Sequence, residues 1–244
     1  MKYQSTFVFL CTILLIMVLA IKPSQSQILI SLLLGDKLNT GNIEFGLEGG
    51  YNRSYLSGID EAKGMGNFHL GFYFDFRIKN DWLLNTGVRV KSNSGATKIT
   101  PYSLDDHELD SVFLYDGYVK RKIGYFYVPI HIKYRFAKQF FVNAGVQIGL
   151  RHKANDIFTN TYYDEDDVKF TYDIRDQITR LDAGLSGGAG YKFKGTGMNL
   201  GVTYYYGLVD IDKSEVRSMN SSLYIYVDIP IGAGYKEAKQ EKQD

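Results

Sequence analysis

The sequence predicts an all-β fold: an eight-stranded antiparallel up-and-down transmembrane β-barrel with a polar interior, short periplasmic turns and long external loops. Three observations predict it: hydropathy alternates with a period of two, short and long connections alternate, and glycines gather on the polar face. The composition agrees, because 20 Tyr, 15 Phe and 25 Gly against 4 Pro favour strands over helices. A mean hydropathy of −0.19 excludes a membrane protein built of several apolar helices.

The alternation is clearest in residues 67–78, where Phe68, Leu70 and Phe72 share a face with three further apolar side chains. The other face carries polar residues and Gly71, because successive side chains of a strand point to opposite sides. Seven further segments alternate in the same way: 43–50, 82–91, 124–136, 140–151, 178–193, 198–209 and 223–231. Each is close to the length that a tilted strand needs to cross a bilayer.

The connections between these segments fall into two alternating classes. Three are short, at 79–81, 137–139 and 194–197, and four are long, at roughly 53–66, 92–121, 152–177 and 210–221. Such sorting is typical of an outer-membrane barrel with both termini in the periplasm.

Glycine indicates which face points inward. A soluble, lipocalin-like barrel would bury the apolar face around a greasy ligand, whereas a membrane barrel turns it to lipid. The polar face carries the glycines that a crowded, narrow interior requires: Gly46, Gly50, Gly71, Gly87, Gly145, Gly149, Gly184, Gly188, Gly190, Gly201 and Gly207. We therefore expect the polar face inside, with Trp82, Tyr134, Phe136 and Phe140 in an aromatic girdle near the short turns.

An inward polar face would bury many charges: Glu44, Glu48, His69, Asp75, Arg77, Arg89, His131, Lys133, Arg135, Arg151, Arg180, Asp182 and Asp228. Because an unpaired buried charge is costly, we expect a mutually neutralising core of salt bridges. A proton or ion path is the alternative.

Residues 1–26 read as a secretory signal peptide, with Lys2 ahead of an apolar run and a small-residue cleavage site before Gln27. A short periplasmic segment (27–41), the barrel domain (42–234) and a charged C-terminal tail (235–244) follow. Cys11 is the only cysteine and lies in the apolar run, which excludes a disulfide framework and any Cys-based metal site. A net charge of +1 argues against a nucleic-acid partner.

The chain resembles the outer-membrane β-barrel proteins of Bacteroidetes, the PorT-like or "outer membrane protein beta-barrel" group. The resemblance runs from Gln27 to about Gly232 and rests on these motifs: Phe45-Gly46-Leu47-Glu48-Gly49-Gly50, His69 to Phe76, Tyr127 to Tyr134, Phe141 to Gly145, Asp182 to Leu185, Gly188 to Tyr191 and Tyr206-Gly207-Leu208. The resemblance implies an integral outer-membrane barrel. A minority of the proteins in this group are linked to secretion and gliding machinery. The resemblance supplies no catalytic residue. Many outer-membrane barrels end on an aromatic residue. This chain differs from them, because it continues past Gly234 into the charged tail.

The residues suggest no catalytic, cofactor-binding or metal site. Small membrane barrels that act on lipid pair His with Ser at the lipid boundary, but none of His69, His107, His131 and His152 has a Ser two residues further along its strand. Pairing across strands stays open. The acidic runs 164–167 and 105–108 match no calcium-loop spacing, so we expect solvated loops, and no phosphate loop or dinucleotide motif is present.

We therefore expect a non-enzymatic, structural or binding barrel in the outer membrane of a Gram-negative bacterium that displays its loops to the exterior. Its expected partners are outer-membrane lipid, the barrel assembly machinery and an envelope or extracellular protein, without a cofactor. The alternatives are a component of an envelope secretion or assembly machine, with the tail and residues 28–34 facing periplasmic partners, and a lipid-modifying enzyme. A secreted soluble lipid carrier is a further alternative, which an inward polar face would exclude.

Overall fold

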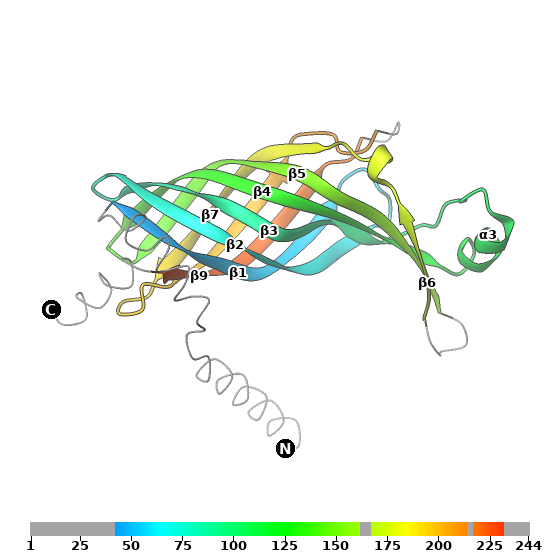
Figure 1. The fold of residues 1–244 in the computed structure, drawn as a ribbon, viewed down its shortest axis with the longest axis horizontal. Coiled ribbons are helices and arrows are strands. Elements are labelled where there is room, and N and C mark those ends of the chain that lie inside the picture. The colour runs from blue at the N-terminus through cyan, green and yellow to red at the C-terminus, as the bar shows by residue number, and fades with distance from the viewer. Residues whose placement is uncertain (1–41, 162–166, 214–216, 232–244) are drawn as a thin grey trace, which may run out of the picture. The chain divides into compact units, whose positions relative to one another are not determined.

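In a computed structural model, eight antiparallel strands form a sheet that closes into a ring, and a ninth strand pairs with the far end of one of them (Figure 1). The structure describes residues 42–161, 167–213 and 217–231, which belong to one unit, Asn39–Asp244. The predicted signal peptide, the segment 27–41, the tail 235–244 and the acidic residues 164–166 lie outside the described residues. The strands are β1 (Ile43–Leu56), β2 (Lys63–Lys79), β3 (Trp82–Ile99), β4 (Tyr118–Phe136), β5 (Phe140–Thr161), β6 (Asp167–Asp173), β7 (Leu181–Lys192), β8 (Asn199–Gly207) and β9 (Asn220–Ile231).

The ring contains the eight predicted strands in the predicted order. Neighbours pair as β4-β3-β2-β1-β9-β8-β7-β5, and pairing of β4 with β5 closes the circle. Closure leaves the ring without an unpaired edge, which a lipid environment demands because no water is there to bond free backbone groups. The up-and-down barrel is therefore confirmed.

Two of the long connections are shorter than predicted, because the strands continue past the ends of their apolar patterns. The connection expected at 53–66 is confined to residues 57–62, and the one expected at 92–121 is confined to 100–117. The apolar alternation ends before the strand does. Beyond the lipid an outward side chain need not be apolar, while the backbone hydrogen bonds between the strands continue unchanged.

The connection expected at 152–177 contains structure that the alternation does not reveal. Its first part extends β5, and β6 pairs with β5 alone, followed by a 3-10 turn, η1 (Arg175–Gln177). A short helix, α3 (His107–Phe113), lies between β3 and β4. Both α3 and β6 lie at the end of the barrel that is opposite the short turns (Figure 1). Among the described residues, no helix is long and apolar enough to cross a bilayer.

The polar face points inward, as predicted from the glycines. Phe68 is 75% exposed and Leu70 is 54% exposed on the outside, whereas Glu48 and Asp75 are buried in the interior. This orientation is the reverse of that in a soluble barrel that buries apolar side chains around a lipid, and so removes the lipid-carrier alternative. Arg77 and Arg180 depart from the predicted interior set, since both are exposed near the ends of their strands. Side chains there reach water beyond the closed part of the barrel.

Glycine is required where the backbones of neighbouring strands leave no room for a side chain. A Cβ at Gly71 would lie 2.3 Å from the backbone oxygen of Val88, and one at Gly145 would lie 2.1 Å from that of Ile130. Both contacts are far inside van der Waals range, so any larger side chain would force the neighbouring strands apart.

Candidate functional site

The middle of the barrel interior holds an ion pair between Glu48 of β1 and Arg89 of β3. The Arg89 Nε lies 2.5 Å from Glu48 Oε1, and Arg89 also donates to the side-chain oxygen of Gln147 at 2.7 Å. The His69 ring nitrogen lies 3.3 Å from the same carboxylate, and the guanidinium is 4.4 Å from the centre of the Tyr224 ring. The pair is therefore enclosed by polar and aromatic groups from several strands.

A second set of charges lies nearer the short turns. Lys133 donates to Asp75 at 2.6 Å, and the amide of Asn85 donates to the other oxygen of Asp75 at 2.7 Å. Lys192 pairs with Glu44 at 2.5 Å, although the two residues lie 148 positions apart in the sequence. These contacts confirm the predicted core of salt bridges in part: Glu44, Glu48 and Asp75 each pair with a cation, whereas no described cation forms an ion pair with Asp182 or Asp228.

Asp182 is the acceptor of a third set of interactions. Its carboxylate accepts hydrogen bonds from Tyr127, Tyr205 and Asn220 at 2.8–2.9 Å. No described cation forms an ion pair with it, so neutral donors alone satisfy this buried acid.

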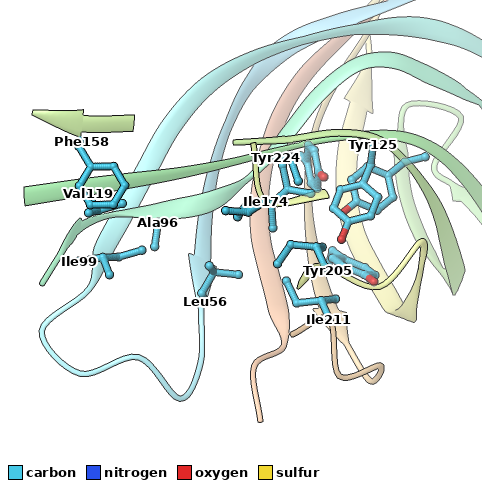
Figure 2. Close-up of a cluster of buried hydrophobic side chains, with 14 of the residues drawn as sticks. Leu56, Ala96, Ile99, Val119, Tyr125, Phe158, Ile174, Tyr205, Ile211 and Tyr224 are labelled. Carbon is cyan, nitrogen blue, oxygen red and sulfur yellow. The ribbon is translucent and has the colours of Figure 1, made fainter. Parts of the chain in front are cut away.

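An apolar cluster, which we call the apolar plug, gathers buried side chains at the end of the barrel with the long connections (Figure 2). Its members come from strands, from α3 and from two connections: Leu56, Ala96, Ile99, Phe113, Val119, Ile123, Tyr125, Tyr127, Ala154, Phe158, Ile174, Ile178, Tyr205, Ile211 and Tyr224. The β6–β7 and β8–β9 connections bond to each other over it, with the Thr179 N–H donating to the Ile211 carbonyl at 2.7 Å. The interior is therefore polar in the middle and toward the short turns, and apolar at the end with the long connections. The sequence does not predict this division.

Polar side chains hold the wall of the plug together. Arg121 of β4 forms ion pairs with Asp156 of β5 and with Asp212 in the β8–β9 connection, both at 2.8 Å. Tyr102, in the β3–β4 connection, donates to Asp156 at 2.9 Å. Burial and the Asp156 carboxylate raise the pKa of Tyr102 above its usual range. Both connections are thereby tied to the strands below them.

The structure brings one His and one Ser together across strands. His131 Nε2 lies 2.5 Å from the Ser186 hydroxyl, and the side chains meet over Gly145, which pairs with both residues. The two side chains face the interior and are 1% and 6% exposed, away from the lipid boundary where a lipid-acting dyad would operate. No described group hydrogen-bonds to His131 Nδ1, so nothing orients the ring as a general base requires. We interpret the pair as a structural contact.

The acidic run 105–108 is part of a helix cap. Asp106 accepts from the backbone N–H groups of Glu108 and Leu109 and so begins α3. Asp110 accepts from the Leu104 N–H and the Ser103 hydroxyl, which hold the pKa of Asp110 below its usual range. Within the described ranges, no three His, Cys, Asp or Glu side chains are grouped to hold a metal ion.

An open pocket at the same end is the candidate binding site. It encloses about 620 Å³ between the β1–β2 and β3–β4 connections, and its lining includes Lys63, Lys98, Tyr115 and Tyr118. Tyr115 is 86% exposed, and the Lys98 ammonium lies 3.8 Å from the centre of the Tyr118 ring. Sequence reasoning did not single out these residues, because exposed Lys and Tyr in a connection are common and only the fold gathers them.

Comparison with known proteins gives one family match. Residues 24–213 match the model of a family described as the outer membrane protein beta-barrel domain. No curated protein matches the chain. Among solved structures, the chain is similar to Ail of Yersinia pestis, with 12% identity and a TM-score of 0.41, covering 78% of this chain and 99% of that one. It is also similar to Neisserial surface protein A (11% identity, TM-score 0.36, covering 77% and 96%) and to OprG of Pseudomonas aeruginosa (14% identity, TM-score 0.35, covering 77% and 92%).

Proposed function

Because the chain belongs to the outer membrane protein beta-barrel domain family and is an outer-membrane barrel, we propose that it serves as a closed anchor that presents a binding surface outside the cell. The surface is the end that carries α3, β6 and the pocket around Tyr115, and the short turns face the periplasm. The observation that supports this function most directly is the apolar plug. A barrel whose mouth is packed with buried apolar side chains is built to hold connections in place and not to conduct.

The pocket has the chemistry of a recognition site. Exposed tyrosine rings offer flat, amphipathic contact area, and Lys63 and Lys98 add positive charge beside them. Loops on a rigid scaffold are where binding usually resides, and the Tyr102 and Arg121 contacts supply that rigidity here.

Site-specific labelling tests the proposed orientation. No cysteine lies among the described residues, so Tyr115→Cys and Asn80→Cys each add one thiol, at opposite ends of the barrel. We expect a membrane-impermeant maleimide to label the Tyr115→Cys variant in intact cells, and the Asn80→Cys variant only after the outer membrane is permeabilised. The opposite pattern would overturn the proposal. The unsubstituted protein controls for any thiol that Cys11 contributes.

Planar-bilayer recording tests the closed interior. The purified protein is expected to insert without stepwise conductance, because side chains fill the interior at the levels of Asp75, Glu48, Asp182 and the plug. Regular conductance steps in the unsubstituted protein would contradict a closed anchor.

A role in an envelope secretion or assembly machine, as proposed from the resemblance to PorT-like proteins of Bacteroidetes, is the second candidate. The favouring features are the charged tail 235–244 and the apolar segment 28–34, which we expect on the periplasmic side. In-cell crosslinking from the tail should capture an envelope protein if this is the function, and capture of none would count against it. Lipid-modifying activity has less support, since His131 and Ser186 lie in the barrel interior.

A further inference from the structure

Three lysines from neighbouring strands gather on the outer wall of the barrel, away from the Tyr115 pocket. They are Lys91 of β3, Lys122 of β4 and Lys153 of β5. The register brings them together: Gly124 of β4 pairs with Asn93 on one side and with Lys153 on the other, and Lys122 is two positions further along.

Two irregularities in the wall turn extra residues outward at this level. The register of β3 against β4 shifts between Arg89 and Ser92, and both Val90 and Lys91 are exposed although they are adjacent in sequence. The register of β4 against β5 shifts at Gly124, where His152 and Lys153 are both exposed. A β-bulge re-aims side chains in this way. Regular alternation would have pointed one residue of each adjacent pair into the barrel.

The wall is hollow between the lysines. A pocket of about 330 Å³ is lined by Lys91, Lys122, Lys153, His152 and Asn93 with their neighbours. Gly124 lies at its floor, and the His152 ring lies over it, because a Cβ at Gly124 would come within 2.7 Å of that ring. The same imidazole stacks on Phe126, with ring centres 4.5 Å apart.

The charges around this pocket are unbalanced. No described carboxylate forms an ion pair with Lys91, Lys122 or Lys153, and Lys122 experiences Coulomb repulsion from Lys91, Lys120 and Lys153. The nearby Asp173, which pairs with Asn155 across the β5–β6 ladder, is bound to Arg175 at 2.8 Å. Like charges gathered this closely are destabilising unless an anion joins them, so the pocket is complementary to a group with more than one negative charge.

The apolar belt begins directly below the lysines. Val88, Val90, Phe126, Ile148 and Leu150 face outward on the same three strands and are 36–43% exposed. A ligand that is apolar below and anionic above therefore fits this wall, and a membrane lipid has that arrangement. We propose that Lys91, Lys122 and Lys153 bind the phosphate of a membrane lipid whose acyl chains lie along the belt. Ammonium groups would donate charge-assisted hydrogen bonds to the phosphate oxygens.

Native mass spectrometry of the folded protein in detergent tests the proposal with three probes: a diacylglycerol phosphate, the same diacylglycerol without phosphate, and inorganic phosphate. We expect the phosphorylated lipid alone to bind, and about fivefold weaker binding for each lysine replaced by Gln, as expected for single cations at an anionic lipid surface. The variant Lys91→Gln/Lys122→Gln/Lys153→Gln should therefore lose most of the bound lipid.

A matched triple variant, Lys79→Gln/Lys138→Gln/Lys194→Gln, removes the same charge from exposed positions near the short turns and should bind as the unsubstituted protein does. Equal loss in both triple variants would overturn the proposal, because it would show a general charge effect. Binding of inorganic phosphate as tight as that of the lipid would overturn the role of the belt. A heat-dependent shift on electrophoresis identifies the folded variants, and unchanged lipid binding by the folded Lys91 triple variant would refute the site.

Discussion

Glu48 and Arg89 form their ion pair across a strand to which neither belongs. Gly71 of β2 pairs with Glu48 on one side and with Arg89 on the other, and the absence of a side chain at Gly71 lets the two charges meet. The same arrangement recurs where Tyr127 bonds to Asp182 over Gly149. Inward glycines thus leave space in a narrow barrel and also permit contacts between strands that are not neighbours.

The role of Gly71, which lies between Glu48 and Arg89 on the intervening strand, can be tested by substitution. Gly71→Val should lower the free energy of unfolding by about 1–3 kcal/mol, because its Cβ would overlap the Val88 carbonyl and force the wall to move. Denaturant unfolding in detergent measures the loss. Gly187→Ala is the matched control, since its Cβ would meet no atom closer than 3.3 Å. An equal effect of both substitutions would contradict the explanation.

Removing both partners of the ion pair should cost less than the sum of the costs of removing each one alone. Glu48→Gln leaves Arg89 buried without its counter-charge, so we expect a loss of about 3–5 kcal/mol in unfolding free energy. The double variant Glu48→Gln/Arg89→Gln should be destabilised by less than the sum of the single variants. Asp173→Asn breaks the exposed Arg175 pair and should cost less than about 1 kcal/mol. Additive single effects at Glu48 and Arg89 would refute the coupling.

The hydrogen bond from Tyr102 to Asp156 should make the stability of the β3–β4 connection depend on pH in the alkaline range. The pKa of Tyr102 is raised in the folded protein, so its neutral form stabilises the fold fully below the pKa of an unfolded tyrosine, about 10, and the stabilisation is lost as pH rises through the higher folded pKa. Tyr102→Phe should cost about 1–2 kcal/mol at neutral pH, measured by thermal unfolding. The difference from the unsubstituted protein should shrink above pH 10. Tyr115→Phe, at an exposed ring, should show no such difference.

The apolar plug should respond to a cavity as a protein core does. Ile178 is fully buried, so Ile178→Ala should cost about 2–5 kcal/mol and should increase hydrogen exchange in the β6–β7 and β8–β9 connections. Ile78→Ala, where the side chain is 59% exposed, is the control. Unchanged exchange after Ile178→Ala would show that the plug does not hold these connections.

The single tryptophan reports the position of the short turns. Trp82 is 48% exposed on the outer wall and lies 4.7 Å from Tyr134, ring centre to ring centre. An aromatic girdle prefers the boundary between headgroups and acyl chains, so lipids with a nitroxide near the headgroup should quench Trp82 more strongly than lipids with a nitroxide at the end of an acyl chain. The reverse order would place this end of the barrel deeper than the girdle requires.

The part of the fold that the sequence predicts follows from two local patterns, the alternation of apolar and polar residues and the positions of the glycines. Alternation with a period of two identifies each strand crossing the lipid, because one face of such a strand must be apolar along its whole crossing. In 67–78 this identified both the strand and the outward side of Phe68 and Leu70, and the glycines of the other face identified the interior. Where lipid no longer constrains the outer face, the pattern ends, and it therefore predicts loops where the structure has the extended ends of the strands and β6.

Alternation along the chain identifies the eight crossing strands, their connectivity and most of the charges that share the interior. Which interior side chains meet depends on the closed ring, because the register of the strands brings Glu48 to Arg89 and His131 to Ser186. The apolar plug, the Tyr115 pocket and the lysines around Gly124 arise in the same way. Each consists of side chains from several strands or connections. The alternation within one segment does not show which other segment lies beside it in the closed ring.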